Sequence, residues 1–253
     1  LILVAQDPTA YGEDWGRPGA ICELLDRLQE IDGIRWIRIL YAYPERISDA
    51  FIAAMVRNTK VVPYLDLPIQ HCDDAVLKAM NRRGGRKEIE DAIARLRAAI
   101  PGITLRTTLI AGFPGETEEQ YAELCDFVKT VRFDRLGCFA YSAEENTVAA
   151  KMPNQIDEET KQRRADHIME LQAEVSAERE GEKVGHTYEC ICDGVDDETG
   201  MYLLRTKADC PEIDGNVLTP ADTPLETGAF YKVTITDSDT YDLYGYAEER
   251  LED

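Results

Sequence analysis

The first 150 residues alternate short apolar segments with segments whose apolar residues recur at helical spacing. This alternation is typical of chains that build parallel sheets and barrels from repeated strand–helix units. We expect five strands, at about Leu1–Ala5, Trp36–Ala42, Val61–Leu65, Thr104–Ile110 and Arg135–Tyr141. We expect helices between them, at about Ala20–Ile31, Asp49–Arg57, Asp74–Asn81, Lys87–Ile100 and Glu118–Val131.

Local signals mark the start of one helix and the end of another. Thr117 and Gln120 have the spacing of a capping box before the last of these helices, and Pro101-Gly102 ends the helix before it. Five strands are too few to close a βα barrel. The first strand has the composition of an interior strand, and no Met stands at residue 1. We therefore expect a partial barrel, cut from a longer chain that holds an upstream unit.

The pattern changes after Pro153. A polar helix is expected over about Glu158–Glu180, and Gly181 ends it. Beyond it, alternating segments separated by Asp, Gly, Thr and Pro turns predict a small, OB-like β-barrel. Its expected strands lie near His186–Cys192, Met201–Thr206, Gly215–Leu218, Ala229–Ile235 and Leu243–Glu248.

Charge is the strongest clue in the composition. The chain has a net charge of −21, and residues 183–253 hold 17 acidic and 5 basic side chains. Such a surface repels nucleic-acid phosphates and attracts basic partners, although acidity also serves solubility alone. No apolar stretch is long enough to span a bilayer and no signal peptide opens the chain, so we expect a cytoplasmic protein without a membrane partner.

Cysteine usage indicates a reducing compartment rather than a disulfide framework. The seven cysteines are odd in number and scattered along the chain. Cys190 and Cys192 lie two apart on an expected strand, so both side chains share one face. A metal site there lacks two further ligands nearby, and we expect core residues instead.

Polar residues follow every expected strand of the first half, where parallel barrels place their catalytic groups. Arg106 falls inside an expected strand, and a charged residue there needs a partner or a ligand. In the turn that follows, Gly112 and Gly115 allow backbone to approach a flat ligand, and Glu116 precedes a helix N-terminus. The same turn is also compatible with a purely structural cap. His71 is either a general base or a histidine hydrogen-bonded under a loop.

Five stretches together resemble, in order and spacing, the barrel of the radical S-adenosylmethionine methylthiotransferases. They are LVAQDPTAYG, RILYAYP, YLDLPIQHCDDAVLKAMNRRG, RTTLIAGFPGETEEQ and CFAYSAEENT. The later part resembles a TRAM domain, and its RTKADCPEIDG stretch resembles the branch that modifies a ribosomal protein. The resemblance implies an α/β fold, with a partial radical SAM (βα) barrel over residues 1–152. A connecting helix over 153–182 and a small all-β TRAM barrel, OB-like, over 183–253 follow.

The same resemblance implies the cofactors. Members bind S-adenosylmethionine on a 4Fe-4S cluster held by a Cys-x3-Cys-x2-Cys loop, and a preceding domain holds a second 4Fe-4S cluster. No such spacing occurs in this sequence, so we expect both sets of ligands upstream and the chain alone to be inactive. In the intact enzyme, cleavage of S-adenosylmethionine to a 5′-deoxyadenosyl radical precedes sulfur insertion and methylation.

Cofactor-binding residues follow from motif position in that family. Gln6 and Asp7 are expected at the methionine end of S-adenosylmethionine, and Gln70, His71 and Arg106 at its polar groups. The adenine is expected along Gly112, Gly115 and Glu116, and along Phe139 and Tyr141.

The resemblance also implies the substrate. It is small-subunit ribosomal protein twelve, a basic protein modified at the β-carbon of an aspartate, and we expect Asp209, Glu212 and Asp214 to contact it. No direct nucleic-acid binding is expected. A tRNA methylthiotransferase with the same barrel and a non-catalytic binding module are the alternatives, and the acidic balance disfavours the first. A metal-dependent hydrolase has little support, because the sequence has only three histidines and no paired acidic cluster, and these are too few ligands.

Overall fold

The computed structural model describes residues 1–222 and 224–252. The chain divides into two compact units, residues 1–172 and residues 173–253. The helix α6 (Glu158–Gly181) begins in the first and ends in the second. The first half of the expected connecting helix therefore packs with the sheet, and the three-part division at residues 152 and 182 stays a prediction.

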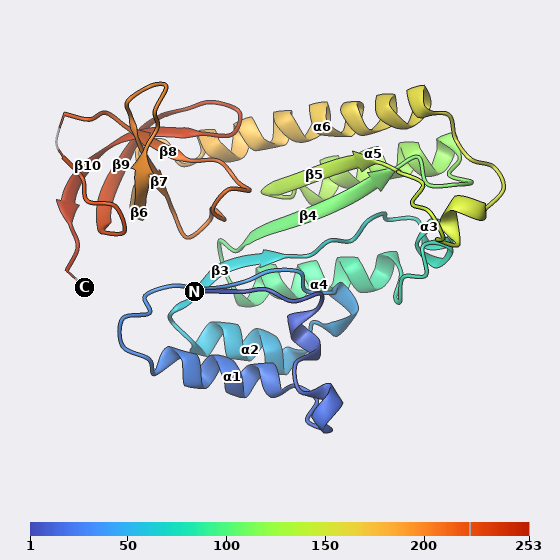
Figure 1. The fold of residues 1–253 in the computed structure, drawn as a ribbon, viewed down its shortest axis with the longest axis horizontal. Helices are drawn as coiled ribbons and strands as arrows, with labels where there is room; N and C mark the ends of the chain where they lie inside the picture. Colours follow the sequence, from blue (N-terminus) through green and yellow to red (C-terminus); the bar gives the residue numbers. More distant parts are fainter. Residues whose placement is uncertain (223, 253) are drawn as a thin grey trace. The chain divides into compact units, whose positions relative to one another are not determined.

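The first unit is an open, five-stranded parallel sheet in the order β1-β2-β3-β4-β5. Its elements lie close to the ranges expected from sequence, and β4 and β5 are seen as adjacent parallel arrows in Figure 1. The strands are β1 (Ile2–Leu3), β2 (Ile37–Ile39), β3 (Val61–Asp66), β4 (Thr104–Ala111) and β5 (Arg135–Ala140). The helices are α1 (Ala20–Gln29), α2 (Asp49–Arg57), α3 (Asp74–Ala79), α4 (Arg86–Ala99) and α5 (Glu118–Val131), with short 3-10 turns at Pro8–Ala10, Glu13–Trp15, Pro44–Arg46 and Ala149–Lys151.

Side-chain caps explain where several helices start. Ser48 accepts a hydrogen bond from the Phe51 N–H at the start of α2, and Asp73 accepts one from the Val76 N–H at the start of α3. Thr117 and Gln120 form the capping box expected for α5. The expected helix start was confirmed at this position.

Two strands are shorter than the apolar pattern predicts. The pattern favoured Trp36–Ala42, but β2 ends at Ile39, and Tyr41 has a φ of 63° that takes the chain out of the extended conformation. The first strand, expected over Leu1–Ala5, is limited to Ile2–Leu3. Hydrogen bonds from Leu40 N to the Leu3 carbonyl and from Ala42 N to the Asp66 carbonyl still hold the segment in the sheet.

One face of the sheet carries the hydrophobic core. On β4, Leu105 and Leu109 are fully buried, while Arg106, Thr108 and Ile110 alternate with them and are only partly buried. Leu136 and Cys138 of β5 pack against the same core as Leu105 and Leu109. The helices α1 and α2 lie side by side (Figure 1), and each contributes to this core. The opposite face of β4 and β5 is therefore the one left for polar groups.

The second unit contains a closed five-stranded barrel in the order β10-β8-β7-β6-β9, with β10 also paired to β9. The strands are β6 (Thr187–Val195), β7 (Tyr202–Arg205), β8 (Val217–Thr219), β9 (Phe230–Ser238) and β10 (Leu243–Arg250). Cys190 and Cys192, two residues apart on β6, lie in its buried core with Leu204 and Val233. The expected small β-barrel is confirmed. Among the described residues no group of three or more His, Cys, Asp or Glu side chains is placed to hold a metal ion.

Candidate functional site

The open face of β4 and β5 brings together side chains from both strands. In the parallel register Thr108 lies opposite Gly137, and Ile110 lies opposite Phe139. Residues paired across a parallel sheet share a face because the pleats of neighbouring strands are aligned. Phe139 lies on β5, the edge strand next to β4, and is 62% exposed. An exposed aromatic ring beside a glycine and a threonine hydroxyl is a surface on which a flat ligand can stack.

Arg106 has a protein partner on this face. Its Nη1 lies 2.9 Å from Oδ1 of Asp66, the last residue of β3, which is 1% exposed. Oδ2 of Asp66 accepts a hydrogen bond of 3.3 Å from the Tyr41 N–H. Burial raises the pKa of the Asp66 carboxyl, and the nearby Arg106 opposes that shift. The charge inside the strand is thus balanced by an aspartate that sequence reasoning did not select.

The two residues selected after β1 differ in their surroundings. Asp7 caps the short helical turn at Pro8–Ala10 by accepting hydrogen bonds from Thr9, and its Oδ2 lies 2.9 Å from Nε of Arg46. Gln6 is exposed. Asp7 is therefore committed to local structure, and contact of either residue with a ligand stays a prediction.

Gln70 is held by the neighbouring strand. Its N–H donates to the Thr108 carbonyl and its carbonyl accepts from the Ile110 N–H, at 2.9 and 2.8 Å. Its φ of 70° is unusual for a residue other than glycine. These bonds fix Gln70, which is partly exposed, beside the polar face of β4.

His71 and Glu116 are brought together beneath the surface. Both side chains are 0% exposed, and Nε2 of His71 lies 3.4 Å from Oε2 of Glu116. The same carboxylate oxygen accepts a hydrogen bond from the Gly112 N–H, and the other oxygen lies 2.7 Å from Nη1 of Arg164 on α6. Both residues thus hold the loops together, and their predicted contact with a ligand stays a prediction.

The glycines of the loop after β4 behave differently from one another. A Cβ at Gly112 would collide with the side-chain carbons of Lys161. The space beside Gly112 is therefore occupied by a side chain of α6 and is not open to a flat ligand. At Gly115 the corresponding space is open. Both have positive φ angles, of 76° and 86°, which favour glycine.

Tyr141, also selected from sequence, packs beneath the surface. Its ring contacts Phe113 edge-on at 5.2 Å between centroids, within a small cluster that includes Val76. Its carbonyl accepts a hydrogen bond of 3.0 Å from Nζ of Lys161. Of the two aromatic residues expected near the adenine, only Phe139 presents an exposed ring.

Sequence reasoning missed Lys161 and Arg164 because they are charged. The apolar residues Ile168, Leu171 and Val175 form a stripe at helical spacing along α6. In the structure the buried positions continue toward the N-terminus through Ala165, Arg164 and Lys161, at the same helical spacing. The available signal was this spacing, in which two charged residues extend an apolar stripe.

The acidic loop between β7 and β8 separates into structural and exposed residues. Asp209 is buried and accepts hydrogen bonds from both the N–H and the hydroxyl of Thr206, at 2.9 and 2.6 Å. Asp214 accepts from the Cys210 N–H at 2.8 Å. Glu212 is exposed at the tip of the loop. Of the three predicted substrate contacts, Glu212 alone is exposed.

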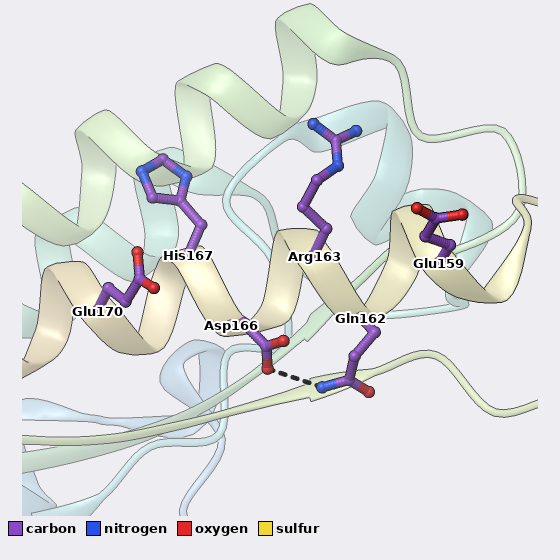
Figure 2. Close-up of a pocket in the computed structure, with 6 residues that line it drawn as sticks. All are labelled: Glu159, Gln162, Arg163, Asp166, His167 and Glu170. Atoms are coloured by element: carbon purple, nitrogen blue, oxygen red, sulfur yellow. Dashed lines mark hydrogen bonds between the residues drawn. The ribbon is translucent and has the colours of Figure 1, made fainter.

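A groove along the first half of α6 does not have the features of a ligand site. Figure 2 shows the six exposed side chains that line it, namely Glu159, Gln162, Arg163, Asp166, His167 and Glu170. Gln162 and Asp166 are hydrogen-bonded to each other at 2.7 Å along the helix. The groove is a solvated helix face of mixed charge.

The residues present suit one implied cofactor and not the other. The ring of Phe139, the hydroxyl of Thr108 and the guanidinium of Arg106 suit a ligand with a flat part and charged groups, as S-adenosylmethionine has. The described residues offer no set of cysteines for an iron–sulfur cluster. No helix of the described part is long and apolar enough to cross a membrane.

Comparison with known proteins identifies the family of the chain. The radical SAM superfamily model matches residues 1–128, and the TRAM domain model matches residues 184–247. The chain therefore belongs to the radical SAM superfamily. Solved structures with low identity show the same fold. Coproporphyrinogen III oxidase from Escherichia coli has a TM-score of 0.52 and 21% identity, covering 62% of this chain and 37% of its own. Elp3 from Methanocaldococcus infernus has a TM-score of 0.50 and 16% identity, covering 68% and 44%.

Curated relatives extend the similarity over both units. The ribosomal protein uS12 methylthiotransferase RimO of Pelobacter propionicus is 46% identical over 99% of this chain and 56% of its own length. RimO of Lachnoclostridium phytofermentans is 46% identical over 98% of this chain and 56% of its own length. The chain thus spans about half the length of the curated relatives it matches.

Proposed function

We propose that this chain is the catalytic barrel and TRAM region of a ribosomal protein uS12 methylthiotransferase of the RimO type. The observation that carries the proposal is the 46% identity to RimO proteins, which extends across 99% of the chain and through both units. The reaction adds a methylthio group to the β-carbon of an aspartate in uS12. We place the protein in the cytoplasm, with its substrate.

S-adenosylmethionine, when bound, supplies radical and methyl-transfer chemistry. We assign two 4Fe-4S clusters to the whole protein and none of their ligands to the residues described here. Phe139 would stack on the adenine, and Arg106 and Gln70 would hold the polar groups of S-adenosylmethionine. Asp66 would keep the Arg106 guanidinium in one orientation, through the 2.9 Å ion pair.

The acidity of the second unit supports a basic protein substrate. Residues 183–253 carry 17 acidic and 5 basic side chains, an unfavourable surface for a tRNA phosphate backbone. We therefore propose no direct nucleic-acid binding. Glu212 is the acidic side chain of the β7–β8 loop that is free to meet a basic partner.

The test is modification of uS12 by the whole protein with its clusters reconstituted under reducing conditions without oxygen. We expect mass spectrometry to show one hydrogen of one aspartate residue replaced by a methylthio group. A uS12 variant with that aspartate replaced by alanine is the matched control and should stay unmodified. Methylthiolation of tRNA in place of uS12 would contradict the proposal.

A further inference from the structure

We propose that Arg164 and Lys161 of α6 are positioning residues for S-adenosylmethionine binding, because they fix the loops that follow β3, β4 and β5. Neither residue is expected to touch the ligand. The inference rests on the proposed use of the open face of β4 and β5 as the S-adenosylmethionine site.

Arg164 joins two of these loops through one carboxylate. Its side chain is 4% exposed, and Nη1 donates to the carbonyl and to the carboxylate of Glu116, at 3.2 and 2.7 Å. Nη2 also donates to Glu118, at 2.6 Å. The other oxygen of the Glu116 carboxylate accepts from the Gly112 N–H. The start and the end of the β4–α5 loop are thus tied to the same buried ion pair.

The loop after β3 meets the same carboxylate through His71. The Asp73 N–H donates to Nδ1 of His71 at 3.0 Å, so a neutral His71 carries its proton on Nε2. Nε2 faces Glu116 Oε2 at 3.4 Å. Glu116 therefore has polar neighbours from three segments, namely the loop after β3, the loop after β4 and α6.

Lys161 fixes the third loop. Its buried Nζ donates to the Tyr141 carbonyl at 3.0 Å, directly after β5, and also pairs with Glu158. Its methylene stem fills the space beside Gly112. A further bond, from Gly115 N to the Asn154 carbonyl at 3.0 Å, ties the β4 loop to the segment before α6.

The energetic cost of burying these charges favours a role in fixing the loops over a role in only packing α6 against the sheet. Burying an arginine and a glutamate costs several kcal/mol of desolvation, and apolar side chains of similar volume often hold a helix on a sheet equally well. An apolar contact is non-directional, whereas these hydrogen bonds fix named backbone atoms of the loops. Both anchored loops begin where β4 and β5 end, beside Ile110 and Phe139 of the open face.

The test compares four variants in the whole, cluster-reconstituted protein: Arg164→Met, Arg164→Lys, Lys161→Met and Gln172→Met. Gln172 is the matched control, because it is also buried on α6 and donates to a carbonyl, that of Phe133, which precedes β5 rather than following it. Lys161→Met retains a stem beside Gly112 and loses the donor to Tyr141 and the pair with Glu158, so it serves if Arg164→Met does not fold. The ligand is S-adenosylhomocysteine, measured by calorimetry at a temperature where each variant is folded.

We expect Arg164→Met and Lys161→Met each to weaken binding of S-adenosylhomocysteine about tenfold or more. Hydrogen exchange should become faster in residues 112–117 for Arg164→Met and in residues 141–147 for Lys161→Met. Arg164→Lys should restore part of the affinity, and Gln172→Met should lower stability without changing affinity. Unchanged affinity in both loop-anchoring variants would overturn the proposal, as would an equal loss in Gln172→Met. A wild-type protein that binds the ligand but leaves uS12 unmodified would contradict the proposed function and leave the positioning role standing.

Discussion

Arg106 of β4 and Asp66 of β3 form an ion pair of 2.9 Å across two neighbouring parallel strands, with the carboxylate almost completely buried. The pair lies in register, so each side chain fixes the direction of the other. Arg106 is thereby presented to the open face in one orientation. The guanidinium that we propose as a binding group is thus ordered before a ligand arrives.

Replacement of Arg106 by methionine should destabilise the chain by about 3 kcal/mol at neutral pH, because a buried carboxylate is left without its partner. The pKa of Asp66 is already raised by burial, and loss of Arg106 removes a factor that lowers it. A carboxyl whose pKa is higher in the folded than in the unfolded chain stabilises the fold at pH values below the unfolded pKa. That stabilisation is lost as the pH rises through the folded pKa. The cost should therefore shrink toward pH 5, as measured by urea unfolding. The double variant Arg106→Met/Asp66→Leu should lose less than Arg106→Met alone, and an equal loss would contradict the pairing.

Replacement of Phe139 by alanine should affect ligand binding and not stability. Its exposed ring makes few core contacts, so the free energy of unfolding should change by no more than about 0.5 kcal/mol. Stacking of a base on an aromatic ring contributes about 1–3 kcal/mol, so affinity for S-adenosylhomocysteine should fall by about fivefold or more. Phe139→Tyr retains the ring and should bind normally. Calorimetry on the whole protein measures the affinity of both variants. Unchanged affinity in the alanine variant would show that Phe139 does not contribute to the site.

Alkylation should separate the cysteines by burial. Burial raises the pKa of the fully buried Cys72 thiol to about 12, whereas Cys22 is partly exposed. At pH 8 the thiolate fraction of Cys72 is on the order of 10⁻⁴, so Cys22 should react first with iodoacetamide. Because pH 7–9 lies below this pKa, the rate at Cys72 should rise about tenfold per pH unit without a plateau. Peptide mass spectrometry follows both sites, and Cys22→Ser should abolish the first reaction.

Two acidic residues of the β7–β8 loop should respond oppositely to substitution. Asp209→Ala leaves the buried Thr206 N–H and hydroxyl without their acceptor and should cost about 1–3 kcal/mol in thermal or urea unfolding. Glu212→Gln changes an exposed charge and should leave stability unchanged. It should instead weaken binding of the whole protein to uS12, with a loss that diminishes as salt is raised. Equal binding by the Glu212→Gln variant at low salt would exclude this contact.

Sequence patterns predicted most elements because local and tertiary preferences agree in them. The helices Asp49–Arg57 and Glu118–Val131 lie at the predicted residues, where Ser48 and Thr117 provide caps. The sequence did not predict the early end of β2, because the positive φ of Tyr41 has no signal in a tyrosine. Backbone conformation there follows from the hydrogen bond to Asp66, a residue distant in sequence.

The site was harder to predict than the fold. Motif position drew attention to the loops after β3, β4 and β5, yet it does not distinguish an exposed side chain from one buried under the loop. His71 and Glu116 are of the second kind, and Arg164, the partner of Glu116, lies 48 residues further along the chain. Asp66 was missed because an aspartate at a strand end is common, and only the register identifies its pairing with Arg106.

The closed order of the second unit has a consequence for self-association. Each of its strands has two neighbours, so none of β6–β10 presents a free row of backbone donors and acceptors to another chain. The parallel sheet of the first unit has two edges, and next to β1 the side chains of Leu1, Ile2 and Val4 are exposed. Edge-to-edge pairing with a strand of another chain is therefore available to the parallel sheet, at β1 or β5, and not to the described strands of the acidic barrel.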